Sequence, residues 1–336
     1  MQQQTLVEVR GLAKTFKRPD GTEVQAVRGI DLDIYRGEIF SMLGPNGAGK
    51  TTTISMISGL LEPTAGTAKI GGHSITQQPM EAKRLLGVVP QEIALYPTLS
   101  ARQNLEFFGR MYGLGGKELG SSVDEVLEFT DLKDRAKDRV DTFSGGMKRR
   151  VNIGVGLLHK PQLVYMDEPT VGVDPQSRRR ILDTVLRLRE ERKMTVLYTT
   201  HLMEEAQELS NRVGIVDQGK MIALGTVGEL IQQVGEEDRL ILTTDKNSVS
   251  DALLQSIQGS VQGVTRASYE PPVEISETSD KAQPGKITIY AKRGRKALPQ
   301  VLQLTNEAGV EVTSVEVREP DLEAVFLHLT GRELRD

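Results

Sequence analysis

The sequence of 336 residues contains no cysteine, which excludes disulfide bonds and thiolate metal sites. It also has no run approaching the roughly 20 apolar residues that are needed to span a bilayer. Lysine and arginine number 42 against 46 acidic residues, so no overall basic field draws the chain to nucleic acid or anionic lipid. The opening residues, Met1 to Gln4, lack a charged-then-apolar leader, and no signal peptide is expected. Any role at a membrane would therefore require another chain to do the spanning.

What the sequence does contain is typical of a folded globular protein. Apolar residues make up 38% and charged residues 26% of the chain, and the length allows two domains. No internal repeat is evident. Up to about residue 235, strand-like apolar runs alternate with helical patterns. This alternation predicts an α/β core built on a mostly parallel sheet.

The most informative motif is GPNGAGKT at Gly44–Thr51. It fits the pattern of a glycine, four residues and Gly-Lys-Thr, between an apolar strand at 39–43 and a helix expected at 52–60. Its glycines allow a tight turn that points N–H groups at an anion, and the helix start adds its positive dipole end. Lys50 supplies charge for the β- and γ-phosphates, and Thr51 a hydroxyl for Mg²⁺. A glycine-rich turn that binds nothing is the alternative. The candidate ligands are Gly44, Pro45, Asn46, Gly47, Ala48, Gly49, Lys50, Thr51 and Thr52.

Two carboxylates follow the apolar run at 163–166. Asp167 and Glu168 would lie at the C-terminal end of a parallel strand, which faces the ligand crevice in such sheets. Asp167 is placed to hold Mg²⁺ through water, and Glu168 to polarise an attacking water. Taken alone, the two could be solvated side chains that end a strand. The phosphate loop upstream favours the functional interpretation.

Ser144, Gly145 and Gly146 indicate a second small anion site, because they stand directly before a helix. The same residues could instead form an ordinary N-terminal helix cap. Their position, about 20 residues before Asp167, favours the anion site.

Periodicity predicts further elements in the first two thirds of the chain. Several helices are expected between about 99 and 160. Strands are expected at 6–9, 24–27, 30–34, 86–91 and 195–200, hairpins at 67–72 and 215–224, and helices at 178–192 and 202–209.

The pattern restarts beyond a boundary at 235–238. Strand, helix, strand, strand, helix and strand are expected in an order typical of ferredoxin-like α+β domains. The polar stretch 275–286 is expected to be an exposed loop. The sequence thus predicts domains at 1–235 and 236–336. The expected elements are strands at 240–243, 264–269, 287–290 and 312–317, and helices at 249–257, 297–308 and 322–329.

Residues 5–230 resemble the nucleotide-binding subunits of ATP-binding cassette (ABC) transporters. Gly44–Thr51 is similar to the phosphate loop of this family, Ser144–Gly146 to its signature motif and 163–168 to its second Walker motif. The resemblance implies an α/β fold of the P-loop NTPase class. Its RecA-like core would carry an antiparallel β-subdomain and a helical subdomain at about 92–160.

The family order also implies roles for four single residues. Gln91 matches the glutamine loop that senses Mg²⁺ and water, Asp174 the aspartate loop, His201 the switch histidine that contacts the γ-phosphate, and Phe16 an aromatic that stacks on adenine. Without the family, Gln91 would be a loop residue, His201 a surface or capping histidine and Phe16 a core residue. Met147 departs from the glutamine of the commonest signature. We expect it to be tolerated, because the motif acts through its serine hydroxyl and glycine N–H groups.

The resemblance implies ATP and Mg²⁺ as cofactors and ATP hydrolysis as the activity. In the family, the signature of one subunit closes over the ATP that the other subunit holds. A chain with one phosphate loop and one signature is therefore expected to pair head-to-tail with a second copy of itself. The implied catalytic residues are Lys50, Glu168 and His201, and the implied metal site consists of Thr51, Gln91 and Asp167.

The segment 319–331 resembles the ending of drug-exporter-type ATPase subunits, such as the daunorubicin-resistance group. This implies a separate polytopic permease, a place at the cytoplasmic face of the membrane, and export of drugs, lipids or other hydrophobic compounds. The C-terminal domain could assist dimerisation, contact the permease, regulate it, or only add stability.

Two other classes of protein also use a phosphate loop. A soluble ABC ATPase in nucleic-acid repair or translation would usually carry two cassettes, a long coiled coil or basic surfaces, and none is evident here. No nucleic-acid partner is expected, and the basic runs 148–150 and 178–180 fit solvated helix faces. A P-loop kinase is disfavoured by Ser144–Gly146 and His201. The transported substrate cannot be read from this chain.

Overall fold

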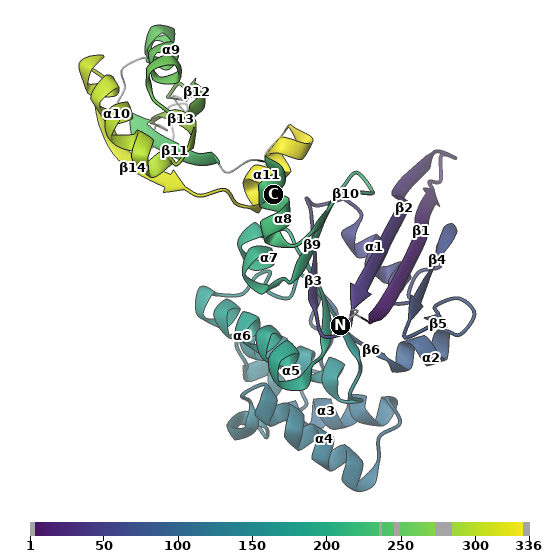
Figure 1. Ribbon diagram of the computed structural model, residues 1–336. Helices are drawn as coiled ribbons and strands as arrows, with labels where there is room; N and C mark the ends of the chain where they lie inside the picture. Colours follow the sequence, from purple (N-terminus) through teal and green to yellow (C-terminus); the bar gives the residue numbers. More distant parts are fainter. Residues whose placement is uncertain (1–3, 235–236, 245–248, 273–283, 332–336) are drawn as a thin grey trace. The chain divides into compact units, whose positions relative to one another are not determined.

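The computed structural model describes residues 4–234, 237–244, 249–272 and 284–331 (Figure 1). The chain divides into two compact units, the first ending at Val227 and the second beginning at Gly228. None of the helices in the described ranges combines the length and apolar character that crossing a bilayer requires.

The first unit contains two sheets, as the predicted α/β class requires. The order in the antiparallel sheet is β2-β1-β4-β5, and in the larger sheet β10-β9-β3-β8-β7-β6. All neighbours in the larger sheet are parallel except β10 with β9. The strands are β1 (Thr5–Lys17), β2 (Glu23–Tyr35), β3 (Ile39–Leu43), β4 (Ala65–Ile70), β5 (His73–Ser74), β6 (Leu86–Val89), β7 (Leu163–Asp167), β8 (Thr195–Thr200), β9 (Arg212–Asp217) and β10 (Lys220–Gly225).

The helices of this unit pack through two apolar cores, one that contains the helices between 101 and 209 and one that contains those between 50 and 84. Figure 1 shows α3, α4 and α5 packed together, which confirms the prediction of several helices between 99 and 160. The helices are α1 (Lys50–Ile57), α2 (Pro79–Arg84), α3 (Ala101–Met111), α4 (Gly116–Phe129), α5 (Gly145–Leu157), α6 (Pro175–Arg192) and α7 (Met203–Leu209), with single 3₁₀ turns at Lys133–Arg135 and Val140–Thr142. Helix α8 (Val227–Val234) begins at the boundary and belongs to the second unit.

The prediction of separate short strands at 6–9, 24–27 and 30–34 is wrong, because β1 and β2 each run on through a glycine. Gly11 and Gly29 have φ of 56° and 82° and accompany shifts in the β1–β2 register. Such bulges absorb an extra residue without ending the strand. Helix α6 begins three residues before its predicted start, since Asp174 caps it and Pro175 fits its first position. Helices α2 and α8 had no counterpart in the prediction.

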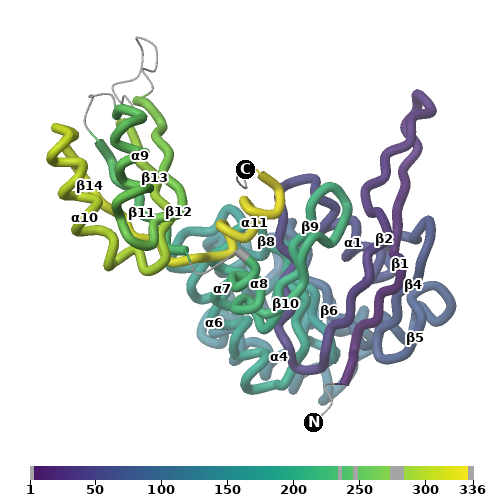
Figure 2. The backbone as a smooth tube through the Cα atoms, turned by 45° about the horizontal axis from the view of Figure 1, so that its top comes forward, coloured from purple at the N-terminus to yellow at the C-terminus, as the bar shows by residue number. Residues whose placement is uncertain are grey.

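The second unit has the predicted β-α-β-β-α-β order with a closing helix. Its sheet order is β12-β13-β11-β14, and each neighbouring pair is antiparallel. Figure 2 shows α9 and α10 running beside the strands, and their apolar residues share a core with one face of the sheet. Most of the expected loop at 275–286 lies outside the described residues. The elements are β11 (Glu237–Thr244), α9 (Asp251–Ser260), β12 (Val264–Glu270), β13 (Gly285–Lys292), α10 (Gly294–Glu307), β14 (Val312–Arg318) and α11 (Leu322–Thr330).

Candidate functional site

The phosphate-loop motif lies between the end of β3 and the start of α1. All five residues of β3 are buried, and the strand pairs in parallel with β8 and β9. Gly47 and Gly49 take φ of 79° and 103°, a left-handed conformation that glycine adopts without strain. The loop therefore emerges at the carboxyl edge of the sheet, where ligands of α/β folds bind. Ala48 is buried, whereas Asn46, Gly47 and Thr51 are exposed at this edge.

Two of the loop glycines lie so close to other backbone that no side chain fits. A Cβ atom on Gly44 would lie 2.1 Å from the Val216 carbonyl oxygen, and one on Gly49 would lie 2.5 Å from the Ala26 carbonyl oxygen. The loop is thus held against β2 and β9 by direct backbone contact. This fixes its position before any ligand arrives.

Lys50 is almost fully buried, with 4% of its surface exposed. Its Nζ donates to the carbonyl oxygens of Gly44 and Pro45 at 2.7 and 3.2 Å, and lies 3.4 Å from Glu168 Oε1. Burial lowers the pKa of Lys50, while the nearby carboxylates of Glu168 and Asp167 oppose that shift. The ammonium group is therefore held at the mouth of the loop by groups that an anionic ligand can replace.

Asp167 and Glu168 lie at the end of β7, as predicted. The hydroxyl of Thr199, on the adjacent strand β8, donates to Asp167 Oδ1 at 2.6 Å and accepts from the Glu168 backbone N–H at 3.0 Å. Glu168 has φ of 41°, an uncommon conformation for a residue other than glycine, and such strain is concentrated at functional sites. His201 Nδ1 lies 3.3 Å from Glu168 Oε2. The structure thus brings Lys50, Asp167, Glu168 and His201 together.

Two residues near these carboxylates were missed by the sequence interpretation. Thr199 fixes both Asp167 and Glu168, and its only signal was a hydroxyl residue two positions before His201. Tyr165 lies on β7 two residues before Asp167, and burial, together with the nearby Asp167, raises the pKa of this phenol beyond its usual range. Both residues are buried, and Thr199 holds the two acidic residues in place.

Ser144, Gly145 and Gly146 form the start of α5. The Ser144 hydroxyl accepts from the Met147 backbone N–H at 3.3 Å, so the capping interpretation describes this conformation correctly. A Cβ on Gly145 would have no atom within 4 Å, whereas one on Gly146 would lie 2.2 Å from the Ser177 Cβ. Gly145 thus has open space where a side chain would begin, and Gly146 packs the motif against α6.

Three further predicted residues do not belong to the group of Lys50, Asp167, Glu168 and His201. Asp174 caps α6, where its carboxylate accepts from the Ser177 backbone N–H at 2.9 Å, and this lowers the pKa of Asp174. Gln91 follows β6 and is exposed beside the end of β7. Phe16 is 41% exposed near the end of β1, with Lys14 Nζ 5.4 Å from its ring centroid. An exposed ring of this kind is available for stacking.

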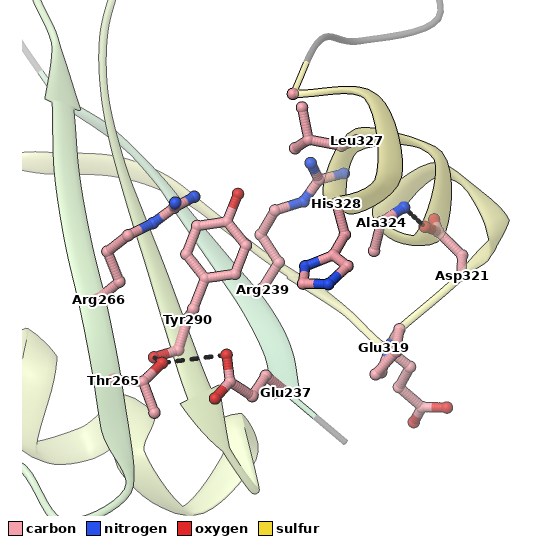
Figure 3. A pocket seen from close by; sticks show the side chains of 12 residues that line it. Glu237, Arg239, Thr265, Arg266, Tyr290, Glu319, Asp321, Ala324, Leu327 and His328 are labelled. Atoms are coloured by element: carbon pink, nitrogen blue, oxygen red, sulfur yellow. Dashed lines mark hydrogen bonds between the residues drawn. The ribbon is translucent and has the colours of Figure 1, made fainter. Parts of the chain in front are cut away.

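A cavity of about 640 Å³ lies in the second unit, away in sequence from all of these motifs (Figure 3). Arg266 stacks on Tyr290 at 4.3 Å, and Figure 3 shows His328 pointing toward the same hollow from α11. Its carboxylates include Glu237, which accepts from Thr265, and Asp321, which caps α11. None of the predicted site residues lines this cavity.

Known proteins are similar to this chain in both sequence and fold. A family model described as ABC transporter matches residues 27–171. Linearmycin resistance ATP-binding protein LnrL of Bacillus subtilis (strain 168) is 46% identical over 96% of this chain and 99% of its own length. Daunorubicin resistance ATP-binding protein DrrA3 of Streptomyces coeruleorubidus is 36% identical over 96% of this chain and 98% of its own. The chain belongs to the ATP-binding subunits of ABC transporters.

A solved structure relates this ABC ATPase subunit to a nucleotide complex. An ATP-binding cassette, dimeric and bound to ADP and Pi in a post-hydrolysis state, has a TM-score of 0.60 at 26% identity. The match covers 66% of this chain and 98% of that chain. The fold prediction of a P-loop NTPase with an antiparallel β-subdomain is confirmed, as is the prediction of an ATPase.

The residues at the edge of the sheet fit ATP and Mg²⁺. Gly47 and Gly49 give the loop its left-handed backbone conformations, and Lys50 supplies one cation beside it. In the described part of the chain, no three acidic or histidine side chains cluster as a metal cage. Mg²⁺ commonly keeps several waters and binds through one or two carboxylates plus substrate phosphates. The Thr51 hydroxyl and the Asp167 carboxylate suit such a shared site.

The close approach of Gly44 to the backbone gives a first prediction for this ABC ATPase subunit. Gly44→Ala is expected to lower the free energy of unfolding by about 1–3 kcal/mol, because the added methyl group overlaps the Val216 carbonyl. Gly120→Ala on α4 is the control, since its Cβ meets no atom within 4 Å and should stabilise the helix by about 0.5–1 kcal/mol. Denaturant unfolding of both variants checks this. Equal stability of the Gly44 and Gly120 variants would contradict the close approach.

Proposed function

We propose that this protein is the ATP-hydrolysing subunit of an exporter of hydrophobic compounds such as drugs or lipids. The observation that carries the proposal is the placement of Glu168 at the end of β7, between Lys50 and His201 and beside the phosphate loop. The names of the relatives LnrL and DrrA3, resistance proteins for linearmycin and daunorubicin, support export rather than a soluble role.

In the proposed mechanism, the phosphate loop from Gly44 to Thr51 holds the phosphates of ATP. The γ-phosphate replaces Glu168 as the partner of Lys50, which frees the carboxylate to orient a water molecule in line with the scissile bond. His201, 3.3 Å from Glu168, stabilises the transferring phosphoryl group. Mg²⁺, held by Thr51, Gln91 and Asp167, would neutralise charge that develops on the phosphates.

The proposed working form is a head-to-tail dimer. Each chain carries one phosphate loop and one signature, so Ser144–Gly146 of a second copy would complete each site. ATP binding would favour the closed dimer and bias the permease toward another conformation, because a ligand shifts an equilibrium toward the state that it binds better. Phe16 would stack on adenine, and Asp174 would serve as the residue of the aspartate loop.

An exposed aromatic cluster offers a surface for the proposed permease. Tyr96 and Phe107 make an edge-to-face contact with ring centroids 4.7 Å apart, and Phe107 contacts Phe108 at 5.3 Å. Tyr96 and Phe107 are 46% and 37% exposed. Exposed aromatic residues are enriched at protein interfaces, and this cluster follows the Gln91 loop along the chain. The site of the chemistry and the surface for the partner are thus neighbours in sequence.

The test is affinity purification from native membranes, where a stoichiometric polytopic membrane protein is expected to accompany this chain. Phe107→Asp should abolish this association, because binding would bury an unpaired charge in an apolar contact. It should leave ATP hydrolysis by the isolated subunit within about twofold. Met80→Asp, at another exposed apolar side chain, is the control and should retain the partner. Recovery of only soluble protein or nucleic acid would instead favour the soluble ATPase.

A further inference from the structure

Helix α5 and strand β6 approach each other closely enough for their backbones to be in direct contact. A Cβ on Gly87 of β6 would lie 2.0 Å from the carbonyl oxygen of Gly156 on α5. A Cβ on Gly156 would in turn lie 3.1 Å from the Val89 side chain. Two elements in such close contact shift together, since the interior is close-packed. The signature motif starts α5, and the Gln91 loop follows β6, so both functional segments are attached to the same contact.

Arg149 adds a direct link between α5 and the Gln91 loop. Its side chain donates through Nη1 to the Pro90 carbonyl oxygen at 2.8 Å and through Nη2 to the Gln91 carbonyl oxygen at 2.6 Å. Asn152, on the same helix, donates to the Pro90 carbonyl at 3.4 Å. Arg149 is only 3% exposed. A planar guanidinium that holds two successive carbonyls fixes the direction of the loop as well as its distance.

The burial of Arg149 is not fully compensated by hydrogen bonds. Its Nε is one of the few buried side-chain nitrogens that find no hydrogen-bond partner within the described ranges. An unpaired buried donor costs free energy, so stability alone does not explain an arginine at this position. The side chain instead fixes the backbone of Pro90 and Gln91 through two hydrogen bonds.

We propose that Arg149 is a positioning residue that ties the Gln91 loop to the signature helix. When Ser144–Gly146 engage the ATP of the partner copy, the resulting shift of α5 moves the Gln91 backbone of the same chain. Closure over the ATP of the partner copy therefore changes the position of Gln91, the proposed metal ligand in the chain's own ATP site. This inference rests on the roles of Gln91 and of the signature that are proposed above.

The chain provides a matched control at the next residue. Arg150 also lies on α5 and is 6% exposed. It likewise donates to two successive carbonyl oxygens, those of Thr130 at 2.7 Å and Asp131 at 3.1 Å. These carbonyls follow α4 and are far along the chain from Gln91. Arg149 and Arg150 thus match in burial, and each holds two successive carbonyls, Arg149 through both Nη atoms and Arg150 through Nη1 alone. They differ in the loop that they hold.

The experiment compares Arg149→Lys with Arg150→Lys in the full chain. Lysine keeps the positive charge but has no planar fork to hold two carbonyls. For Arg149→Lys we expect kcat to fall roughly tenfold and the Mg²⁺ concentration for half-maximal ATPase activity to rise by a similar factor, as for loss of a group behind a metal ligand. ATP affinity without Mg²⁺ should be unchanged. Arg150→Lys should show a similar loss of melting temperature but keep kcat and Mg²⁺ dependence within about twofold.

Equal kcat and Mg²⁺ dependence in the two variants would overturn the proposal. A fall in kcat that is proportional to the fall in melting temperature in both variants would also overturn it. If Arg149→Lys fails to fold, Asn152→Ala tests the same link, with an expected rise of about twofold to fivefold in the Mg²⁺ requirement. An unchanged Mg²⁺ requirement in Asn152→Ala would then count against it. Failure of the proposed function is recognised separately, because the unmodified chain would then show no ATP hydrolysis that depends on Lys50 and Glu168.

Discussion

Replacing Glu168 with glutamine is expected to lower kcat for ATP hydrolysis by about 10²–10⁴-fold, the range that a general base contributes. An amide cannot take a proton from the attacking water. It has the same shape as the carboxylate and leaves β7, Thr199 and the phosphate loop in place. The carboxylate competes with phosphate for Lys50 at 3.4 Å, so its neutralisation should also leave ATP bound as tightly as before or more tightly.

Three measurements check this expectation. Steady-state hydrolysis gives kcat, calorimetry with Mg-ATP gives affinity, and light scattering gives the mass of the complex, which should double when hydrolysis is blocked. Glu38→Gln is the control, because Glu38 is another buried carboxylate, at the opposite end of β3, whose pKa burial raises. Its kcat should stay within about twofold, as for a group that takes no part in the chemistry. Hydrolysis by Glu168→Gln at the parent rate would show that another group is the base, and a monomer at saturating Mg-ATP would contradict the proposed dimer.

Local patterns in the sequence predicted the class of the fold and the position of most elements. The phosphate loop could be predicted because its chemistry lies within eight consecutive residues, between a strand and a helix with clear periodicity. The order of strands and helices in the second unit was predicted for the same reason, although their register was not. Bulges at Gly11 and Gly29 escaped prediction because a glycine that ends a strand and one that bends it look alike in a sequence.

The features of the site that could not be predicted depend on contacts between residues far apart in the sequence. Thr199 holds Asp167 and Glu168 only because β8 lies beside β7 in the sheet. Arg149 looks like one of three basic residues on a solvated helix, yet it is buried against the Gln91 loop. Lys50 and Glu168 were predicted as separate ligands of ATP and water, whereas here they pair with each other. Each of these depends on which strands and helices become neighbours.

The pairing of Lys50 with Glu168 gives the last prediction. Lys50→Met is expected to weaken ATP binding close to hundredfold, because the loss of one charged hydrogen-bond partner costs about 1.5–3 kcal/mol. It should also destabilise the nucleotide-free protein, since Glu168 would keep a buried carboxylate without its cation. Breaking one side of a buried ion pair costs about 3–5 kcal/mol, and His201 beside Glu168 should reduce that cost.

The double variant Lys50→Met with Glu168→Gln separates the two effects. Removing both charges should restore most of the stability that Lys50→Met loses, because no uncompensated charge is then buried, while ATP binding should stay weak. Denaturant unfolding without nucleotide and calorimetry with ATP measure the two quantities on the same samples. If the double variant were as unstable as Lys50→Met, the contact at 3.4 Å would carry no coupling, and Lys50 would be held by the carbonyl oxygens of Gly44 and Pro45 alone. Recovery of stability without recovery of binding would show that Lys50 has two separate roles, as the partner of the Glu168 carboxylate in the nucleotide-free protein and as a ligand of ATP.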